Sequence, residues 1–158
     1  MKAVLSLGSN IGNREDYLAR ARKALAQTPG VQLVKTSGIY ETEPFGTFAQ
    51  RDFLNQIVIA DITITAEELL ERALSIEADL GRVRVQDKGP RTVDIDLIQV
   101  GDVLSNTPKL TLPHPAAHER AFVLVPWLEA DPQAVLPGFG PVKELVGTVN
   151  ATSVRRYV

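Results

Sequence analysis

The chain has 158 residues, the usual length of one domain, and 44% of them are hydrophobic, which is enough for one core. Its formal net charge of −2 gives no overall attraction to nucleic acid or anionic membranes. It has no cysteine, which excludes disulfides and thiolate chemistry, and its apolar N-terminal run (residues 3–5) is too short for a signal peptide or membrane span. We therefore expect one cytoplasmic domain over residues 1–158.

The first half of the chain predicts three strands and one helix. Residues 2–7 are expected to form a strand, and Asn13 is a plausible cap for the helix that follows. Residues 31–40 and 53–62 are expected to form the second and third strands. Residues 41–52 between them predict a loop that is long for a compact domain, which suggests a function for it.

The second half of the chain predicts two helices and a fourth strand between them. Residues 65–68 form a capping box that opens a helix, and Gly81 ends that helix. Residues 92–100 predict a fourth strand, and a short hairpin-like piece and a helix around residues 119–129 follow. The β-α-β-β-α-β order predicts a ferredoxin-like α+β sandwich, an antiparallel sheet with helices on one face, plus a C-terminal extension. A parallel Rossmann sheet is the alternative, but the second and third strands have no helix between them.

Asp94 and Asp96 give the sharpest chemical signal. Side chains alternate along a strand, so both carboxylates face one side, with Cα atoms about 6.6 Å apart at about 3.3 Å per residue. Two such carboxylates can hold hard cations such as magnesium. The alternative is a half-buried strand that exposes acids to water.

A basic segment comes directly before this strand. Residues 82–91 carry Arg82, Arg84, Lys88 and Arg91 against one acid, Asp87. Guanidinium groups for phosphate oxygens, next to carboxylates for magnesium, are the two halves of a nucleoside triphosphate site. A solvated loop at a helix end is the alternative.

Other residues could contact a ligand. His114 lies between two prolines that fix its backbone, and its imidazole could donate to a phosphate, whereas His118 is expected to be structural or on the surface. Phe53 and Asn55 share a strand face that suits a planar heterocycle, although Phe53 alone is more often a core residue. Residues 8–13 lack the spacing of a phosphate-binding loop, which favours a turn and helix cap.

Together these motifs resemble the 6-hydroxymethyl-7,8-dihydropterin pyrophosphokinase family over nearly the whole chain. The residues that carry the resemblance are Leu7-Gly8-Ser9-Asn10, Tyr40-Glu41-Thr42-Glu43-Pro44, Phe53-Leu54-Asn55, Glu77, Gly81-Arg82-Val83-Arg84, Gly89-Pro90-Arg91-Thr92-Val93-Asp94-Ile95-Asp96-Leu97, Leu112-Pro113-His114-Pro115 and Glu119-Arg120-Ala121-Phe122. The Pro-Arg-Thr-x-Asp-x-Asp stretch together with Pro-His-Pro is highly specific.

The resemblance implies an enzyme of folate biosynthesis that transfers the diphosphate of ATP to the hydroxymethyl group of 6-hydroxymethyl-7,8-dihydropterin and releases AMP. It implies that Asp94 and Asp96 hold two Mg²⁺ ions and that Arg82 and Arg91 are catalytic. Further ATP contacts are implied for Leu70, Glu77, Arg84, Leu97, Ile98, Lys109, Thr111, His114 and Arg120. Pterin contacts are implied for Gly8, Thr42, Glu43, Pro44, Phe45, Phe53, Asn55 and Phe122. We expect a monomer with no nucleic-acid or membrane partner.

Three positions depart from the family pattern. Lys109 stands where arginine is familiar, Glu43 where a second proline can occur, and residues 85–90 contain no tryptophan. Two other functions are weighed against this family. A kinase that transfers the γ-phosphoryl group would release ADP instead of AMP. A ferredoxin-like RNA-binding module would need exposed aromatic side chains, and the low aromatic content of 6% disfavours this alternative.

Overall fold

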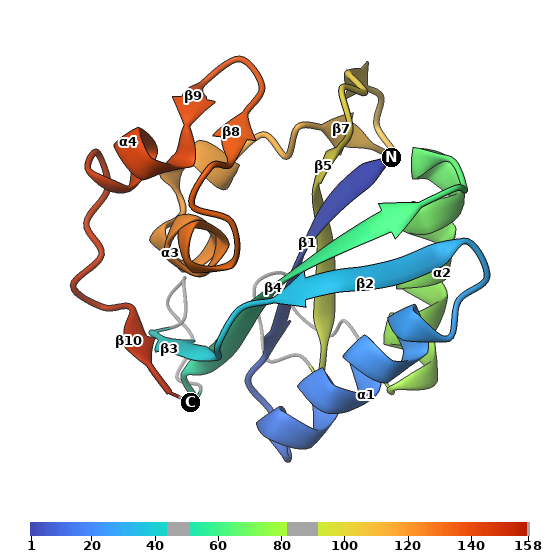
Figure 1. Ribbon diagram of the computed structural model, residues 1–158. Coiled ribbons are helices and arrows are strands. Elements are labelled where there is room, and N and C mark those ends of the chain that lie inside the picture. The colour runs from blue at the N-terminus through green and yellow to red at the C-terminus, as the bar shows by residue number, and fades with distance from the viewer. Residues whose placement is uncertain (44–50, 82–91, 158) are drawn as a thin grey trace.

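The computed structural model describes residues 1–43, 51–81 and 92–157. Within these ranges, a six-stranded sheet runs through the middle of the molecule (Figure 1). Its strands are β1 (Lys2–Ser9), β2 (Val31–Thr36), β3 (Tyr40–Thr42), β4 (Phe53–Ile62), β5 (Asp94–Val100) and β10 (Arg155–Arg156). The order is β10-β3-β4-β1-β5, with β2 also paired to β4, and each of these pairings is antiparallel. The strands therefore form the antiparallel sheet that the sequence predicts.

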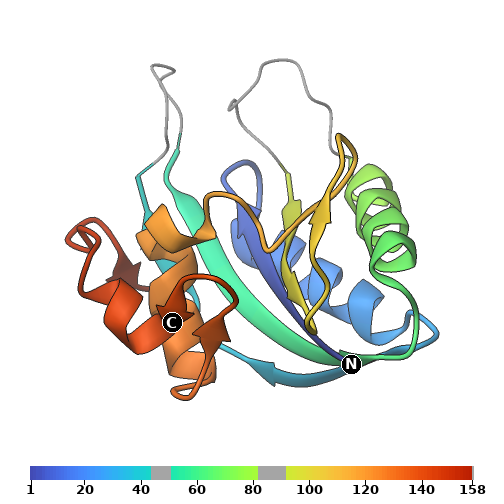
Figure 2. The same ribbon diagram turned by 90° about the horizontal axis from the view of Figure 1, so that it is seen from above.

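The helices lie in two layers, one on each side of the sheet (Figure 2). The elements outside the sheet are α1 (Arg14–Ala26), α2 (Ala66–Asp79), β6 (Ser105–Asn106), β7 (Thr111–Leu112), the 3-10 helix η1 (Ala117–Glu119), α3 (Ala121–Ala130), β8 (Val135–Leu136), β9 (Gly140–Pro141) and α4 (Val142–Val146). The pairs α1 with α2 and α3 with α4 lie on opposite sides of the sheet.

The predicted helix ends are confirmed. The side chain of Asn13 accepts a hydrogen bond from the Asp16 backbone N–H at 3.1 Å and so caps α1. Thr65 and Glu68 form the reciprocal capping box of α2. Gly81 has a φ of +83°, the left-handed conformation in which glycine commonly ends a helix.

The strand predicted over residues 31–40 is instead divided into β2 and β3. Ser37 lies at the break, where its hydroxyl accepts a hydrogen bond from the Ile57 backbone N–H at 2.9 Å. The Ser37 backbone N–H donates to the Ile57 carbonyl at 2.9 Å, so one residue uses both its backbone and its side chain on the same partner. This local bonding interrupts the regular ladder with β4, so the segment forms two strands. The hydrophobic pattern alone gives no sign of the break.

Two hydrophobic cores lie on opposite faces of the sheet. The first packs α1 and α2 against side chains such as Leu5, Leu54 and Ile95. The second packs α3 and α4 against Val4, Ile57, Ile59 and Ile98 of the other face. The expectation of helices on one face thus holds for α1 and α2 and is incomplete, because α3 covers part of the opposite face.

Helix α3 is buried because it is apolar around most of its circumference. Val123, Leu124, Trp127 and Ala130 all belong to the second core, and Trp127, with only 1% exposure, is a core residue. None of the helices in the described ranges has the combined length and apolarity that crossing a membrane requires.

Candidate active site

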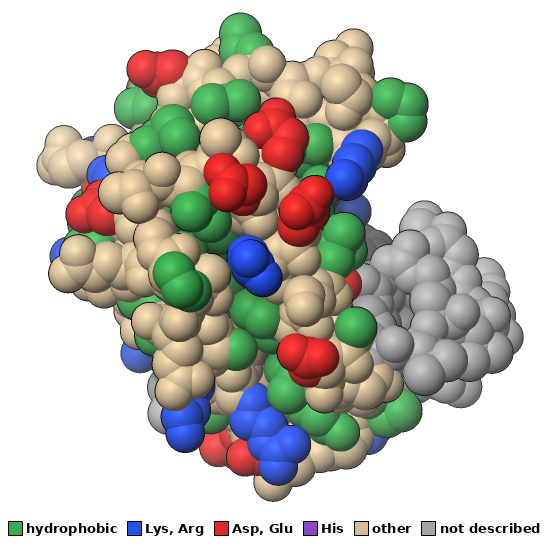
Figure 3. Space-filling model, turned by 90° about the vertical axis from the view of Figure 1, so that its right-hand side faces the viewer, with side chains coloured by type: hydrophobic (Ala, Val, Ile, Leu, Met, Phe, Trp, Pro, Cys, Tyr) green, Lys and Arg blue, Asp and Glu red, His purple; other side chains and the backbone are tan. Residues whose placement is uncertain are grey.

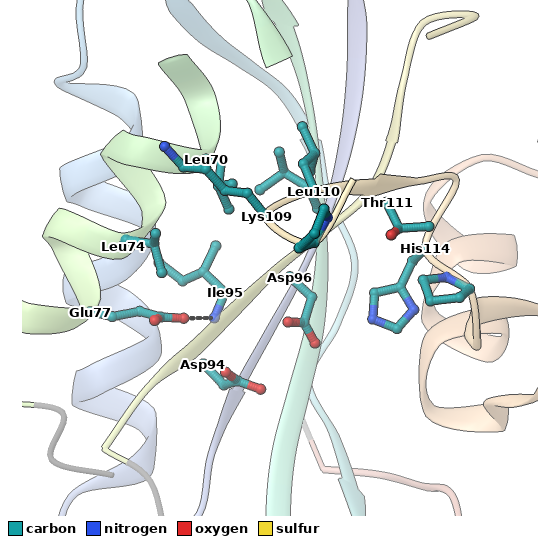
Figure 4. Close-up of a pocket in the computed structure, with 13 residues that line it drawn as sticks. Leu70, Leu74, Glu77, Asp94, Ile95, Asp96, Lys109, Leu110, Thr111 and His114 are labelled. Carbon is teal, nitrogen blue, oxygen red and sulfur yellow. Dashed lines mark hydrogen bonds between the residues drawn. The ribbon is translucent and has the colours of Figure 1, made fainter. Parts of the chain in front are cut away.

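Strand β5 presents two carboxylates on one face and apolar side chains on the other. Ile95 and Leu97 are buried in the first core, whereas Asp94 and Asp96 are half-buried on the opposite side. Figure 4 shows both carboxylates projecting from β5 on the side of His114. The alternation predicted from the sequence is therefore confirmed, and the acids share one face of the sheet.

The central strand β1 connects these acids to a polar group on β4. Gly8 is paired with Asp94 on one side and with Asn55 on the other, and directly paired residues lie on the same sheet face. A Cβ atom at Gly8 would lie 3.4 Å from the Asn55 Oδ1 and 3.6 Å from the Phe53 ring, so the glycine keeps the face between them open. Two strand spacings, about 9.6 Å, separate Asn55 from Asp94 across this gap.

The amide of Asn55 is held in one orientation. Asn55 is 4% exposed, and its Nδ2 donates a hydrogen bond to the Thr42 Oγ1 at 2.8 Å. Thr42 is paired with Phe53, so the amide, the hydroxyl and the aromatic ring lie together where β3 and β4 meet. This group has the planar ring and the fixed donor and acceptor that binding of a flat heterocycle requires.

A pocket of about 310 Å³ lies beside the two aspartates. Helix α2, strand β5 and the segment from residue 108 to residue 115 form its walls (Figure 4). Its lining residues are Leu70, Leu74, Glu77, Asp94, Ile95, Asp96, Leu97, Pro108, Lys109, Leu110, Thr111, His114 and Pro115. The pocket combines an apolar wall from α2 with acids and an imidazole on the opposite side, as expected of a site for a ligand with an apolar ring and a charged group.

Glu77 fixes the backbone between the two aspartates. Its Oε2 accepts a hydrogen bond from the Ile95 backbone N–H at 2.7 Å, and the side chain is only 4% exposed (Figure 4). Strand β5 lies at the edge of the sheet, so this N–H faces α2 and no strand among the described residues accepts it. The buried carboxylate satisfies this edge group and holds the peptide that determines where Asp94 and Asp96 point.

The ring of His114 is neutral and has a defined tautomer. Its backbone N–H donates to the Ile98 carbonyl at 2.9 Å, and its Nδ1 accepts from the Ala116 backbone N–H at 3.1 Å. Because Nδ1 is an acceptor, the proton of the neutral ring is on Nε2. Burial and then the charge of Arg120 lower the pKa of His114 from 6.5 to about 4, against an opposing effect of Asp94. His114 therefore provides a neutral N–H donor beside the aspartates.

The lowered pKa of His114 predicts a pH dependence of stability. As pH falls, the unfolded chain takes up this proton near pH 6.5, whereas the folded chain takes it up only near pH 4. Between these values the unfolded state binds more protons, so stability decreases on acidification. We expect the free energy of unfolding in urea to fall more steeply from pH 6.5 to pH 4 in the wild type than in His114→Gln. Equal slopes in the two proteins would contradict this assignment.

A cation lies close to the acid pair. The Arg120 Nη1 is 4.0 Å from the Asp96 Oδ2, and the guanidinium lies 5.5 Å from the centre of the Phe122 ring. Lys109 is at the outer rim, where its Nζ is 3.7 Å from the Glu71 Oε1 and both side chains are mostly exposed. An exposed pair of this kind contributes little to stability, so Lys109 is available to a ligand in the pocket.

Comparison with known proteins identifies the family of the chain. A family model described as 7,8-dihydro-6-hydroxymethylpterin-pyrophosphokinase (HPPK) matches residues 4–132. The chain belongs to this family. It is 43% identical to the 2-amino-4-hydroxy-6-hydroxymethyldihydropteridine pyrophosphokinase of Methylorubrum extorquens over 98% of both chains. It is 44% identical to the Mycobacterium tuberculosis protein of the same name, over 92% of this chain and 82% of that one.

Solved structures share the fold. The chain superposes on the wild-type HPPK-DHPS of Plasmodium falciparum with a TM-score of 0.70 at 13% identity. The match covers 99% of this chain and 47% of the Plasmodium chain, so this chain spans just under half the length of that protein. At such low identity the likeness concerns the mixed α/β fold with its antiparallel sheet.

Eight of the residues that the HPPK resemblance singles out lie together in the pocket. Leu70, Glu77, Leu97, Lys109, Thr111 and His114 line the pocket with Asp94 and Asp96. Ile98 differs, because its side chain is fully buried in the second core and its carbonyl accepts from His114. The predicted residues Pro44, Phe45, Arg82, Arg84 and Arg91 lie outside the described residues, as does the segment 85–90.

The HPPK pocket has a second apolar contact on α2 that the sequence interpretation missed. Leu74 lines the pocket and is 48% exposed. It follows Leu70 by four residues and precedes Glu77 by three, which places all three on one stripe of the helix. The four-residue spacing from Leu70 is the signal in the sequence that could have placed Leu74 beside it.

Proposed function

We propose that the protein transfers the diphosphate group of ATP to the hydroxymethyl group of 6-hydroxymethyl-7,8-dihydropterin and releases AMP, a step of folate biosynthesis. Membership of the HPPK family supports this reaction. The observation that carries it is the row of paired residues Asn55, Gly8 and Asp94 across the sheet. This row places the amide of Asn55 and the acidic pocket on the same sheet face. Such a row can bring two different substrates together within one site.

Magnesium fits the acid pair. Within the described residues, no three or more His, Cys, Asp or Glu side chains lie close enough together to hold a metal ion by themselves. The described part of the site therefore offers a metal the two carboxylates of Asp94 and Asp96. Magnesium is commonly bound through one or two carboxylates, with phosphate oxygens and water in the remaining positions. We assign two ions to Asp94 and Asp96. When bound with ATP, they would neutralise phosphate charge and orient the triphosphate.

The nucleotide side of the site lies along α2 and the segment 108–115. The apolar wall from Leu70 and Leu74 suits the adenine ring. The Nε2–H of His114 is positioned to donate to a phosphate oxygen, and Arg120 provides a nearby positive charge. The remaining proposed ATP contacts are Glu77, Arg84, Leu97, Ile98, Lys109 and Thr111.

The pterin side of the site lies around Asn55. Its amide would bind the edge of the ring, with Phe53 and Phe122 on the ring faces. The proposed contacts also include Gly8, Thr42, Glu43, Pro44 and Phe45. In this arrangement the hydroxymethyl oxygen attacks the β-phosphorus in line and loses its proton to solvent, the bond from that phosphorus to the α-phosphate oxygen breaks, and AMP leaves. Arg82 and Arg91 are proposed to stabilise the charge that develops in this step.

We also propose that the fold is of the ferredoxin-like class. The strand order β2-β4-β1-β5 with antiparallel neighbours supports a ferredoxin-like class, in which residues 1–158 form one domain with a C-terminal extension. The face over α1 and α2 carries interspersed acidic and basic side chains (Figure 3), which does not favour nucleic-acid binding there. The monomeric state and the cytoplasmic location remain predictions from the sequence.

The nucleotide product tests the proposed function. Protein mixed with Mg-ATP and the reduced pterin alcohol is expected to form AMP in proportion to the pterin consumed, as measured by chromatography of the adenine nucleotides. ADP formation would instead support a γ-phosphoryl kinase. An absence of turnover with tight, salt-sensitive RNA binding would support a nucleic-acid-binding module.

A further inference from the structure

Two arginines from opposite ends of the chain meet where β3 ends and β4 begins, outside the machinery described above. Arg14 opens α1, and its Nη1 donates to the Glu41 Oε2 at 2.7 Å and to the Asp52 carbonyl at 3.0 Å. Arg155 belongs to β10, and its Nη2 donates to the Asp52 Oδ2 at 2.9 Å and to the Glu41 Oε1 at 3.4 Å. Both carboxylate oxygens of Glu41 are thus bound, each by a different arginine.

Residues of the C-terminal tail keep this arrangement in place. Arg155 is paired with Glu41 in the sheet, and Tyr157, two residues later, lies on the same side as Arg155. The Tyr157 hydroxyl donates to the Glu15 Oε1 at 2.7 Å, and the Tyr157 ring lies 5.7 Å from the Arg14 guanidinium carbon. The tail therefore covers Arg14, whose side chain is only 13% exposed.

The bound acids are next to the residues proposed to contact the pterin. Glu41 directly precedes Thr42, and Asp52 directly precedes Phe53. Thr42 and Phe53 are paired, and Thr42 accepts the hydrogen bond that orients the Asn55 amide. Strand β3 has only three residues, so its own ladder gives few hydrogen bonds to hold this corner.

We propose that Arg14 and Arg155 are positioning residues for the pterin side of the site. They hold the end of β3 against the start of β4, and so keep the Thr42 hydroxyl where it fixes the Asn55 amide. This inference rests on the proposed function, in which Asn55 binds the pterin edge. The two arginines also lower the pKa of Glu41, Arg14 having the larger effect, which agrees with an ionised carboxylate shared between them.

The chain offers a matched control on the same helix. The Arg20 Nε lies 2.9 Å from the Asp16 Oδ2, and both side chains are largely exposed, with 61% and 47% of their surfaces accessible. Exposed pairs one helical turn apart contribute little to stability. Arg20→Gln changes the charge as Arg14→Gln does but leaves the corner at Thr42 untouched.

Steady-state kinetics of Arg14→Gln and Arg155→Gln test the proposal. We expect KM for the pterin to rise about 10-fold in each variant, because a fixed amide orientation is lost, while KM for ATP stays within about twofold of the wild type. Arg20→Gln is expected to match the wild type in both constants. Arg155→Lys keeps the charge without the planar fork and is expected to restore part of the pterin affinity.

The outcomes separate this inference from the proposed function. If the wild type shows no pterin-dependent AMP release, the proposed function fails. If the wild type is active and the variants stay folded by circular dichroism with an unchanged KM for the pterin, the positioning role is overturned. A parallel rise of both KM values, or a lower melting temperature with unchanged kinetics, would also overturn it, because either result indicates a purely structural effect.

Discussion

Replacing Asp94 or Asp96 with asparagine is expected to leave the fold intact and to lower turnover by about 10²-fold or more. Each substitution keeps the size of the side chain and removes one negative charge from the pocket face of β5. A neutral amide binds magnesium less well than a carboxylate does, so the triphosphate would lose both its orientation and the neutralisation of its charge. Turnover is measured as AMP release over a range of magnesium concentrations, and circular dichroism checks the fold.

Asp61→Asn is the matched control for this prediction. Asp61 is an exposed residue near the opposite end of β4, where it is paired with Lys2 and Gln32. The same change in charge there is expected to leave turnover unaltered. If Asp94→Asn and Asp96→Asn both turn over ATP at nearly the wild-type rate, the assignment of magnesium to this pair is wrong.

Replacing Asn55 with leucine is expected to lower kcat/KM for the pterin by about 10²-fold, which corresponds to about 2.7 kcal/mol. Leucine has the same branched skeleton of side-chain heavy atoms as asparagine, although it is bulkier, but it can neither donate to Thr42 nor bind the edge of a heterocycle. Each polar group of a ligand edge that is buried without a partner costs about 1–3 kcal/mol. Nucleotide binding is expected to stay unchanged, because the pocket beside α2 does not include Asn55.

A second substitution at this position separates shape from hydrogen bonding. Asn55→Asp keeps the planar shape and the acceptors but removes the donor to Thr42, so we expect an intermediate loss in kcat/KM for the pterin. Binding of ATP, measured by calorimetry, serves as the internal reference for both variants. An equal loss of ATP affinity in Asn55→Leu would show that Asn55 supports the whole site and not the pterin side.

The parts of the fold that the sequence predicts correctly are those governed by local rules. The cap at Asn13, the capping box at Thr65 and the left-handed Gly81 each depend on a few neighbouring residues. The facing of Asp94 and Asp96 depends only on the two-residue period of a strand. These rules need no knowledge of distant partners, so periodicity and capping patterns were sufficient.

Other features depend on contacts that no local pattern records. The hydrogen bond between Arg155 and Glu41 joins residues 114 positions apart. The bond from the Ile95 N–H to Glu77 arises because β5 lies at the edge of the sheet, and strand order does not follow from the sequence of either residue. The sequence also did not predict which face of the sheet α3 covers, because the apolar character of a helix indicates that it is buried but not where it packs.

Strand β5 has a length requirement as well as a chemical one. Its successive residues alternate between the pocket, through Asp94 and Asp96, and the first core, through Ile95 and Leu97. Deleting or inserting one residue here would invert that alternation, burying the carboxylates under α2 and turning the apolar side chains toward the substrates. The stretch therefore cannot tolerate a change in residue number, which must be accommodated beyond Gly101.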